Sequence, residues 1–269
     1  MTGTVAQEEV YVRRTEGPLA WLVLNQPRKK NAISAAMMDR LSDLLLELDA
    51  DPEVLVIILR GEGDNFSSGG DLKQTAASPD PLLSGRLLLR RYLRATRTIR
   101  DIATPVVVMA DGYAVGGAFS LMLAADLVCV SDRVQVIPAF CAIGIAPEMG
   151  MMRLLPDVVG EHRAKEILFL NRGLGSEDLV RMGIANRSFP ADDLVRGTEE
   201  LALAVAAMPS ESVQITKEIM NAATAPGLDA VLAAETTASP FCASASRTRA
   251  AAARRQHSAD PASERGSTR

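Results

Sequence analysis

Short apolar runs alternate with segments of helical periodicity along the first part of the chain. Residues 54–59, 105–110 and 127–130 have the length and the β-branched, apolar composition of buried strands. Helical patterns cover residues 87–102 and 116–125. Strands that alternate with helices pair in parallel, because each helix returns the chain to the starting edge of the sheet. The chain is therefore predicted to be an α/β protein built on a parallel sheet.

The N-terminal residues add two further elements. Residues 10–24 alternate and then turn apolar, and a Glu-Gly-Pro sequence at 16–18 interrupts them, which predicts a β-hairpin. Ser34 has the chemistry of a helix N-cap. Apolar residues follow it at helical spacing, namely Met38, Leu41, Leu45 and Leu48. An Asp-Pro pair at 51–52 ends this predicted helix.

The C-terminal part of the sequence is helical in pattern. Predicted helices occupy residues 161–170, 176–182, 191–207, 209–223 and 228 to about 253. The polar tail that follows lacks periodicity, and we expect it to be disordered. These patterns predict a core over residues 1–200 that carries the functional site, a helical region over 201–253 and a tail over 254–269.

The charge balance and the rare residue types exclude several classes of protein. A net charge of −4 argues against nucleic acid as the main partner, because a protein that binds a polyanion normally carries a basic surface. Three cysteines without CxxC spacing are typical of free thiols in a reducing compartment, and two histidines offer no metal-ligand cluster. The N-terminus is polar, and no apolar run is long enough to span a membrane. We therefore expect a cytoplasmic protein.

Two glycine-rich loops carry the strongest functional signal. Residues 65–72 and 112–118 each stand between a predicted strand and a predicted helix. Glycine lets the backbone approach a ligand closely, and an N–H at a helix start carries partial positive charge that can polarise a carbonyl group. Each loop alone is more often a simple turn, but neighbouring parallel strands can aim two such N–H groups at one oxygen. A helix is predicted from about Asp71, and residues 76–85 are predicted to be a mobile loop.

Four segments of the chain resemble the crotonase, or enoyl-CoA hydratase/isomerase, superfamily in order and in spacing. They are LNQPRKKNAIS at 24–34, FSSGGDLK at 66–73, ADGYAVGGAFSLMLAADLVCVSD at 110–132 and AIGIAPEMGMMRLLPDVVG at 142–160. The resemblance covers roughly residues 10–225. It implies a spiral of ββα repeats whose C-terminal helices assemble a homotrimer or a dimer of trimers.

The resemblance also implies an acyl-CoA thioester as substrate, no separate cofactor and a place in fatty acid metabolism. The family's oxyanion donors correspond to the backbone N–H groups of Ser68 and Gly117. Its substrate-binding positions correspond to Arg28, Lys29, Lys30, Ala32, Ser67, Gly69, Gly70, Asp71, Leu72, Tyr113, Gly116, Ser120 and Phe140. In the family the basic cluster lies near the CoA nucleotide, although a solvated surface turn is an equally good interpretation.

The carboxylates of the family are distributed unusually in this chain. The two positions at which hydratases of the family carry glutamate hold Ser120 and Phe140, neither of which can activate water near neutral pH. Glu148 instead occupies the position of the acid/base of some isomerases, and FSSG-x-DL with the Pro-Glu pair resembles the peroxisomal-type Δ3,Δ2-enoyl-CoA isomerases. One carboxylate suffices to shift a double bond. The apolar residues around Glu148 in the sequence predict a raised pKa.

Three alternatives remain open at this point. Pro147-Glu148 also fits the first turn of a helix, where an exposed glutamate would only stabilise the helix dipole. A non-catalytic acyl-CoA binder would retain the loops without a working acid. A third alternative is another enolate reaction, such as hydrolysis or decarboxylation of a thioester. Ser120 fits packing better than nucleophilic catalysis, because no histidine lies in a motif that could activate it.

Overall fold

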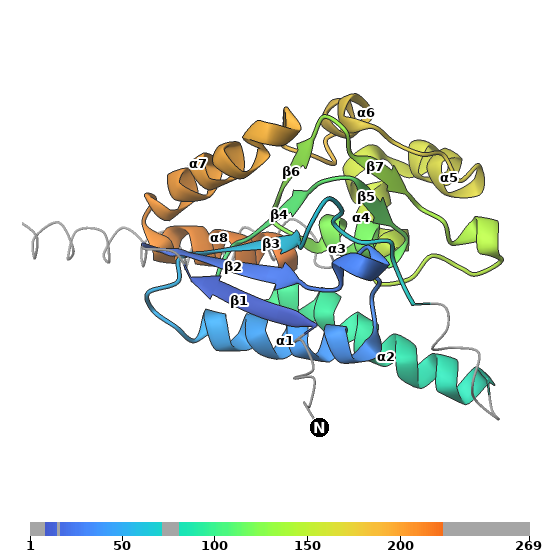
Figure 1. Ribbon diagram of the computed structural model, residues 1–269, viewed down its shortest axis with the longest axis horizontal. Helices are drawn as coiled ribbons and strands as arrows, with labels where there is room; N and C mark the ends of the chain where they lie inside the picture. Colours follow the sequence, from blue (N-terminus) through green and yellow to red (C-terminus); the bar gives the residue numbers. More distant parts are fainter. Residues whose placement is uncertain (1–8, 15–16, 72–80, 223–269) are drawn as a thin grey trace, which may run out of the picture. The chain divides into compact units, whose positions relative to one another are not determined.

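The computed structural model of the protein describes residues 9–14, 17–71 and 81–222 (Figure 1). The strands are β1 (Val10–Arg14), β2 (Leu19–Leu24), β3 (Val56–Gly61), β4 (Val106–Ala110), β5 (Tyr113–Val115), β6 (Leu127–Ser131), β7 (Gln135–Ile137) and β8 (Arg187–Phe189). The α-helices are α1 (Ala35–Asp49), α2 (Pro81–Asp101), α3 (Gly117–Ala124), α4 (Met151–Val159), α5 (Glu161–Phe169), α6 (Ser176–Arg181), α7 (Leu194–Ala206) and α8 (Ser210–Ala222). Short 3₁₀ helices are η1 (Pro27–Lys29), η3 (Cys141–Ile143) and η4 (Ala191–Asp193).

The main sheet has six strands in the order β1-β2-β3-β4-β6-β8. β1 and β2 form the predicted antiparallel hairpin, and every other neighbouring pair in this sheet is parallel. The parallel sheet predicted from strand–helix alternation is therefore confirmed. β5 and β7 form a separate parallel pair, and each follows a strand of the main sheet in the chain, β5 after β4 and β7 after β6. Each of these two strands has only three residues, too short a run to show periodicity in the sequence.

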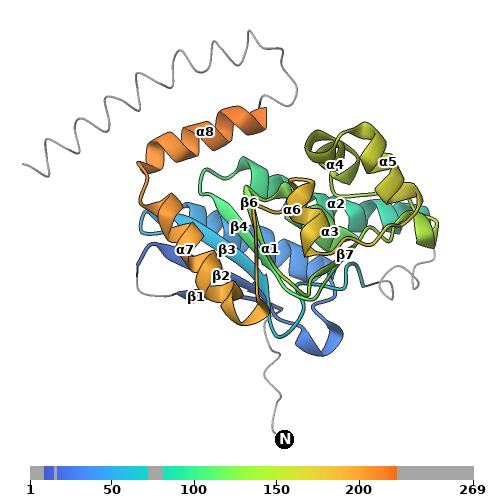
Figure 2. The same ribbon diagram turned by 90° about the horizontal axis from the view of Figure 1, so that it is seen from above.

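The strands bury both faces of the sheet against helices, as parallel strands do. Along β2, Ala20, Leu22 and Leu24 belong to the core that also holds the buried face of α1. The alternate residues, Trp21 and Val23 among them, pack in a second core with residues of α7. Figure 1 shows α1 and α2 on one side of the sheet and α7 on the other, and Figure 2 shows the same arrangement from above. The face covered by α1, α2 and α3 is the one that carries the glycine-rich loops.

Several helix boundaries agree with those predicted from the sequence, and others do not. Ser34 caps α1 as predicted, because its hydroxyl oxygen accepts a hydrogen bond from the Met37 N–H at 2.9 Å. α2 begins at Pro81, so the predicted loop over residues 76–85 is wrong for its last five residues. Proline suits a first helical turn, since its missing N–H would have no partner there. The helix expected from about Asp71 falls on residues outside the described part. α4 was not predicted, and Pro156 lies inside it.

Contacts along the chain divide it into two units, residues 1–207 and 208–269. The predicted boundary after residue 200 falls inside α7, which packs on the sheet and belongs to the first unit. The second unit contributes α8 to the described residues, while the helix expected after residue 228 and the tail lie outside them. No helix within the described ranges is long and apolar enough to cross a membrane.

Candidate active site

The basic N-terminal loop and the first glycine-rich loop lie side by side. Ser67 Oγ donates a hydrogen bond to the Asn31 carbonyl at 2.7 Å. The Ile33 N–H donates to the Gly69 carbonyl at 2.7 Å, and the Asp71 N–H donates to the Ile33 carbonyl at 2.8 Å. Ile33 and Gly70 therefore form a parallel β-bridge. This pairing fixes the backbone on both sides of Gly70.

The second glycine-rich loop packs against the other side of the first. The Ser67 N–H donates to the Tyr113 carbonyl at 2.9 Å, and the Val115 N–H donates to the Ser67 carbonyl at 3.1 Å. Gly69 has φ +84°, and a Cβ there would lie 2.4 Å from the Val115 carbonyl oxygen. Only glycine fits such a contact in the left-handed region. The sequence places the two loops after neighbouring strands, and the structure brings their backbones into contact.

The Ser68 amide does not point into this site. Its N–H donates to the Lys30 carbonyl at 2.8 Å, and its hydroxyl donates to the Lys29 carbonyl at 3.1 Å. A donor that is already paired within the protein is not available to a thioester oxygen, so the assignment of Ser68 as an oxyanion donor is corrected. Gly70, two residues further on, is exposed, and its N–H has no acceptor among the described residues. Gly70 is therefore the candidate donor among the described residues of this loop.

Gly117 supplies the matching amide from the second loop. It is the first residue of α3, and its N–H likewise has no acceptor within the part of the chain that the structure describes. A Cβ at Gly117 would lie 3.6 Å from Ile33 Cδ1 and 2.9 Å from Met149 Sδ. Ile33, which pairs with Gly70, thus also borders Gly117. The two unpaired amides flank the same isoleucine.

Glu148 lies in the loop between η3 and α4, next to this point. α4 begins at Met151, so Glu148 is not in its first turn, and the helix-cap interpretation is wrong. Ser120 Oγ donates to the Glu148 carbonyl at 2.9 Å, which ties the loop to the interior of α3. The following residue, Met149, contacts Gly117. The side chain of Glu148 is half-buried, and this burial raises the pKa of its carboxyl above the ordinary value.

Tyr92 of α2 completes the surroundings of these groups. Its hydroxyl donates to the Ile33 carbonyl at 3.0 Å. Burial raises the pKa of Tyr92 to about 12, with the negative charges of Asp71 and Glu148 as further causes. Sequence reasoning missed Tyr92, because it occupies one position of the apolar stripe of α2 and looks like a core residue there.

The remaining predicted site residues differ in burial. Phe140 and Ser120 are buried, and the Phe140 ring lies 3.8 Å from the point where a Gly116 Cβ would stand. Arg28, Lys29 and Lys30 are exposed on η1 and the residue after it. Lys29 Nζ lies 3.8 Å from an Asp71 carboxylate oxygen, and Lys30 Nζ lies 4.5 Å above the ring of Tyr113. Ala32 is partly buried between the basic cluster and Ile33, and Leu72 lies outside the described residues.

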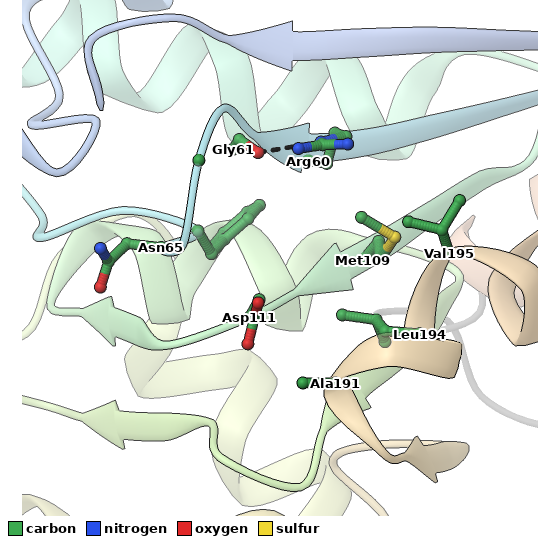
Figure 3. Close-up of a pocket in the computed structure, with 10 residues that line it drawn as sticks. Arg60, Gly61, Asn65, Met109, Asp111, Ala191, Leu194 and Val195 are labelled. Carbon is green, nitrogen blue, oxygen red and sulfur yellow. Dashed lines mark hydrogen bonds between the residues drawn. The ribbon is translucent and has the colours of Figure 1, made fainter.

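A hollow at the carboxyl ends of β3 and β4 is distinct from this site. It is lined by residues of the loop after β3 and by the start of α7, with Arg60, Met109 and Leu194 among them (Figure 3). Arg60 Nε donates to the Gly61 carbonyl at 2.9 Å within it. Met109 and Leu194 belong to the second core, on the sheet face opposite α1 and α2. Asn65 and Phe66 of the first glycine-rich loop line it as well, but Gly70, Gly117 and Glu148 do not.

Curated relatives and a family profile match most of the chain. The profile of the enoyl-CoA hydratase/isomerase family matches residues 14–253. A 4-chlorobenzoyl coenzyme A dehalogenase of Arthrobacter is 32% identical over 214 residues, which cover 79% of this chain and 77% of that protein. A probable enoyl-CoA hydratase of Mycobacterium leprae is 31% identical over 234 residues, covering 84% and 79%. A carnitinyl-CoA dehydratase of Proteus mirabilis is 31% identical over 209 residues, covering 77% and 78%.

Solved structures match the fold. An enoyl-CoA hydratase of Bacillus anthracis superposes with a TM-score of 0.82 at 24% identity, covering 87% of this chain and 90% of that one. A probable enoyl-CoA hydratase/isomerase of Mycobacterium abscessus gives a TM-score of 0.82, with 93% and 97% covered. The crotonase fold predicted from the four sequence segments is confirmed. Because the family profile and relatives at 32% identity each cover most of its length, the chain belongs to the enoyl-CoA hydratase/isomerase family.

Proposed function

We propose that the protein is an isomerase that converts a 3-enoyl-CoA into the conjugated 2-enoyl-CoA. One observation carries the proposal: Glu148, whose side chain is half-buried, directly precedes Met149, which contacts Gly117, and the N–H groups of Gly70 and Gly117 have no acceptor among the described residues. The hydratase positions hold Ser120 and Phe140, and Ser120 already donates to the Glu148 backbone. Addition of water needs one group to activate it and another to deliver a proton, whereas a double-bond shift needs one shuttle.

In this mechanism the thioester oxygen accepts hydrogen bonds from the Gly70 and Gly117 N–H groups. The Glu148 carboxylate removes a proton from C2, and the electron pair delocalises over the thioester and the C3–C4 double bond as a dienolate. The protonated Glu148 then returns the proton to C4, so that no other reagent is consumed. Each preorganised donor typically lowers such a barrier by about 3 kcal/mol. The raised pKa of Glu148 makes it a stronger base than an exposed glutamate.

We also propose that the exposed basic cluster contacts the phosphates of coenzyme A. Arg28 has no carboxylate partner among the described residues, and Lys30 is held over Tyr113. The loop is joined to the glycine-rich loop through Ser68, so phosphates bound there would lie on the route to Gly70. A Thermobifida fusca protein of the same fold, with a TM-score of 0.80, has been solved in complex with CoA.

The proposal is tested by incubating the protein with a 3-enoyl-CoA and following absorbance of the conjugated thioester. Wild-type protein is expected to form the 2-enoyl product. The Glu148→Gln variant is expected to bind the 3-enoyl-CoA without converting it. Glu161→Gln, at the exposed start of α5, is the matched control and should retain full activity. Retention of activity in Glu148→Gln excludes this residue as the shuttle. Release of free CoA indicates hydrolysis, and binding without reaction by the wild type indicates a non-catalytic binder.

A second candidate function follows from the dehalogenases among the relatives at 32% identity. In a dehalogenation, the Glu148 carboxylate would act as a nucleophile on the ring carbon that carries chlorine. The carbon–oxygen bond forms, chloride leaves with the bonding electrons, and water hydrolyses the resulting ester to a hydroxybenzoyl thioester. Release of chloride from 4-chlorobenzoyl-CoA distinguishes this reaction from isomerisation.

The homotrimer or dimer of trimers implied by the family resemblance stays a prediction, and light scattering can measure the oligomeric state.

A further inference from the structure

We propose that Tyr92 is a positioning residue that sets the direction of the Gly70 N–H and thereby the polarisation of the bound thioester carbonyl. This inference rests on the proposed role of Gly70 and adds a residue from α2 to the site. Tyr92 does not belong to any of the glycine-rich or basic segments. Its hydroxyl reaches the site through one backbone carbonyl, that of Ile33.

The Ile33 carbonyl is the point at which three segments meet. It accepts the Asp71 N–H at 2.8 Å and the Tyr92 hydroxyl at 3.0 Å. The Ile33 N–H in turn donates to the Gly69 carbonyl at 2.7 Å. The peptide groups before and after Gly70 are therefore both bonded to Ile33. The Tyr92 hydroxyl uses the remaining lone pair of the Ile33 carbonyl oxygen. It thereby restricts rotation of the β-bridge between Ile33 and Gly70.

The Tyr92 ring also covers Gly70 directly. A Cβ at Gly70 would lie 3.8 Å from Tyr92 Cε2 and 4.0 Å from its hydroxyl oxygen. Tyr92 is only 8% exposed, and it is packed in the core with Ile33 and residues of α1. The orientation of the Gly70 amide therefore depends on the two backbone hydrogen bonds to Ile33 and on this contact with the Tyr92 ring. The phenol therefore limits the movement of the loop at Gly70, while the second glycine-rich loop packs against Gly69.

Burial, together with the charges around the phenol, keeps Tyr92 a hydrogen-bond donor. Asp71 and Glu148 are the acidic groups that act on it, and Arg91 acts weakly in the opposite direction. Burial and the two carboxylates raise the pKa of Tyr92 to about 12, so the hydroxyl keeps its proton throughout the physiological range. The bond to Ile33 consequently does not change with pH while Glu148 titrates. The hydrogen bond from Tyr92 to Ile33 therefore persists during the proton transfer.

The test uses Tyr92→Phe in the intact protein, with Tyr11→Phe as the matched control. Tyr11, on β1, donates its phenolic O–H to a Glu62 carboxylate oxygen at 2.7 Å, and this hydrogen bond is not to a glycine-rich loop. Saturated butyryl-CoA labelled with ¹³C at the thioester carbon serves as the probe, and infrared spectroscopy measures its carbonyl band when bound. The wild type should shift the band to lower frequency than in water. Tyr92→Phe should lose a large part of that shift with little change in Kd, and Tyr11→Phe should keep all of it.

Kinetics give an independent readout. Loss of one positioning hydrogen bond should lower kcat about tenfold for exchange of the C2 hydrogens, with KM nearly unchanged. Replacement of Tyr92 by 4-aminophenylalanine keeps a hydrogen-bond donor at the same point. It should recover the shift of the carbonyl band and the kcat of C2-hydrogen exchange. A wild-type band and kcat in folded Tyr92→Phe would overturn the proposal, as would equal losses in Tyr11→Phe. The carbonyl band is measured on bound butyryl-CoA and does not depend on turnover. If the wild type fails to isomerise a 3-enoyl-CoA, the proposed isomerase activity is excluded, but the infrared test of Tyr92 is still valid.

Discussion

Replacing single backbone amides by esters separates the two candidate oxyanion donors of the first glycine-rich loop. Glycolic acid in place of Gly70 removes the N–H that has no acceptor among the described residues. The α-hydroxy analogue of serine in place of Ser68 removes the N–H that donates to Lys30 at 2.8 Å. Each change also weakens one neighbouring carbonyl that accepts a hydrogen bond, from Ile33 in the first case and from Val115 in the second. The two esters are therefore matched except for the amide that each removes.

The structure predicts opposite effects on rate and on stability. The Gly70 ester loses a donor to the developing oxyanion, which should lower the rate by about 10²- to 10³-fold. The Ser68 ester should keep the rate within a few-fold of wild type. It loses an internal hydrogen bond, however, and should unfold with about 1 kcal/mol less free energy than the Gly70 ester.

Exchange of the C2 hydrogens of butyryl-CoA with solvent deuterium measures the rate of enolate formation, whichever product the enzyme makes. Urea denaturation gives the free energy of unfolding of each variant. Near-normal exchange in the Gly70 ester together with a large loss in the Ser68 ester would exclude Gly70 as the oxyanion donor. It would also restore the assignment made from the sequence.

Three further predictions concern the carboxylate, the loop anchor and the basic cluster. Because burial raises the pKa of Glu148, its ionisation destabilises the fold, so Glu148→Gln should raise Tm at pH 7; this advantage should shrink as the pH falls through the raised pKa and be gone below the ordinary glutamate pKa, and an equal Tm at pH 7 contradicts this. Asn31 is fully buried and bonds the Gln26 N–H and the Glu62 and Asn65 carbonyls, so Asn31→Ala should cost about 2–4 kcal/mol in urea denaturation, and a loss under 1 kcal/mol argues against it. Arg28→Ala combined with Lys30→Ala should raise KM about tenfold for CoA thioesters and leave KM for pantetheine thioesters unchanged, since only CoA carries the nucleotide phosphates; equal effects on both would exclude phosphate contact.

The parts of the fold that were predictable are those with a strong local pattern. The β-branched runs give β3, β4 and β6, and Ser34 gives the start of α1, because burial and capping each leave a signature within a few residues. β8 has three residues, two of them exposed, so it carries no apolar pattern. α4 has glycine at its N-cap and an internal proline, features that normally end a helix.

The site shows the same division between local and long-range information. Gly117 could be predicted, because a helix start after a strand leaves its amide unpaired whatever lies around it. The choice between Ser68 and Gly70 could not be derived locally, since it depends on the pairing of the loop with Lys30 and Ile33, more than 30 residues earlier in the chain. Tyr92 was beyond sequence reasoning for the same reason. Its hydroxyl acts on a residue that lies 59 positions away.

A crystal structure of the protein with bound butyryl-CoA would locate the thioester in the candidate site. The thioester oxygen is expected to lie about 2.7–3.1 Å from both the Gly70 and the Gly117 nitrogen atoms. The Glu148 carboxylate should then lie beside C2 and within reach of C4. A thioester oxygen that contacts neither amide, or a Glu148 side chain turned toward bulk solvent, would contradict the proposed mechanism.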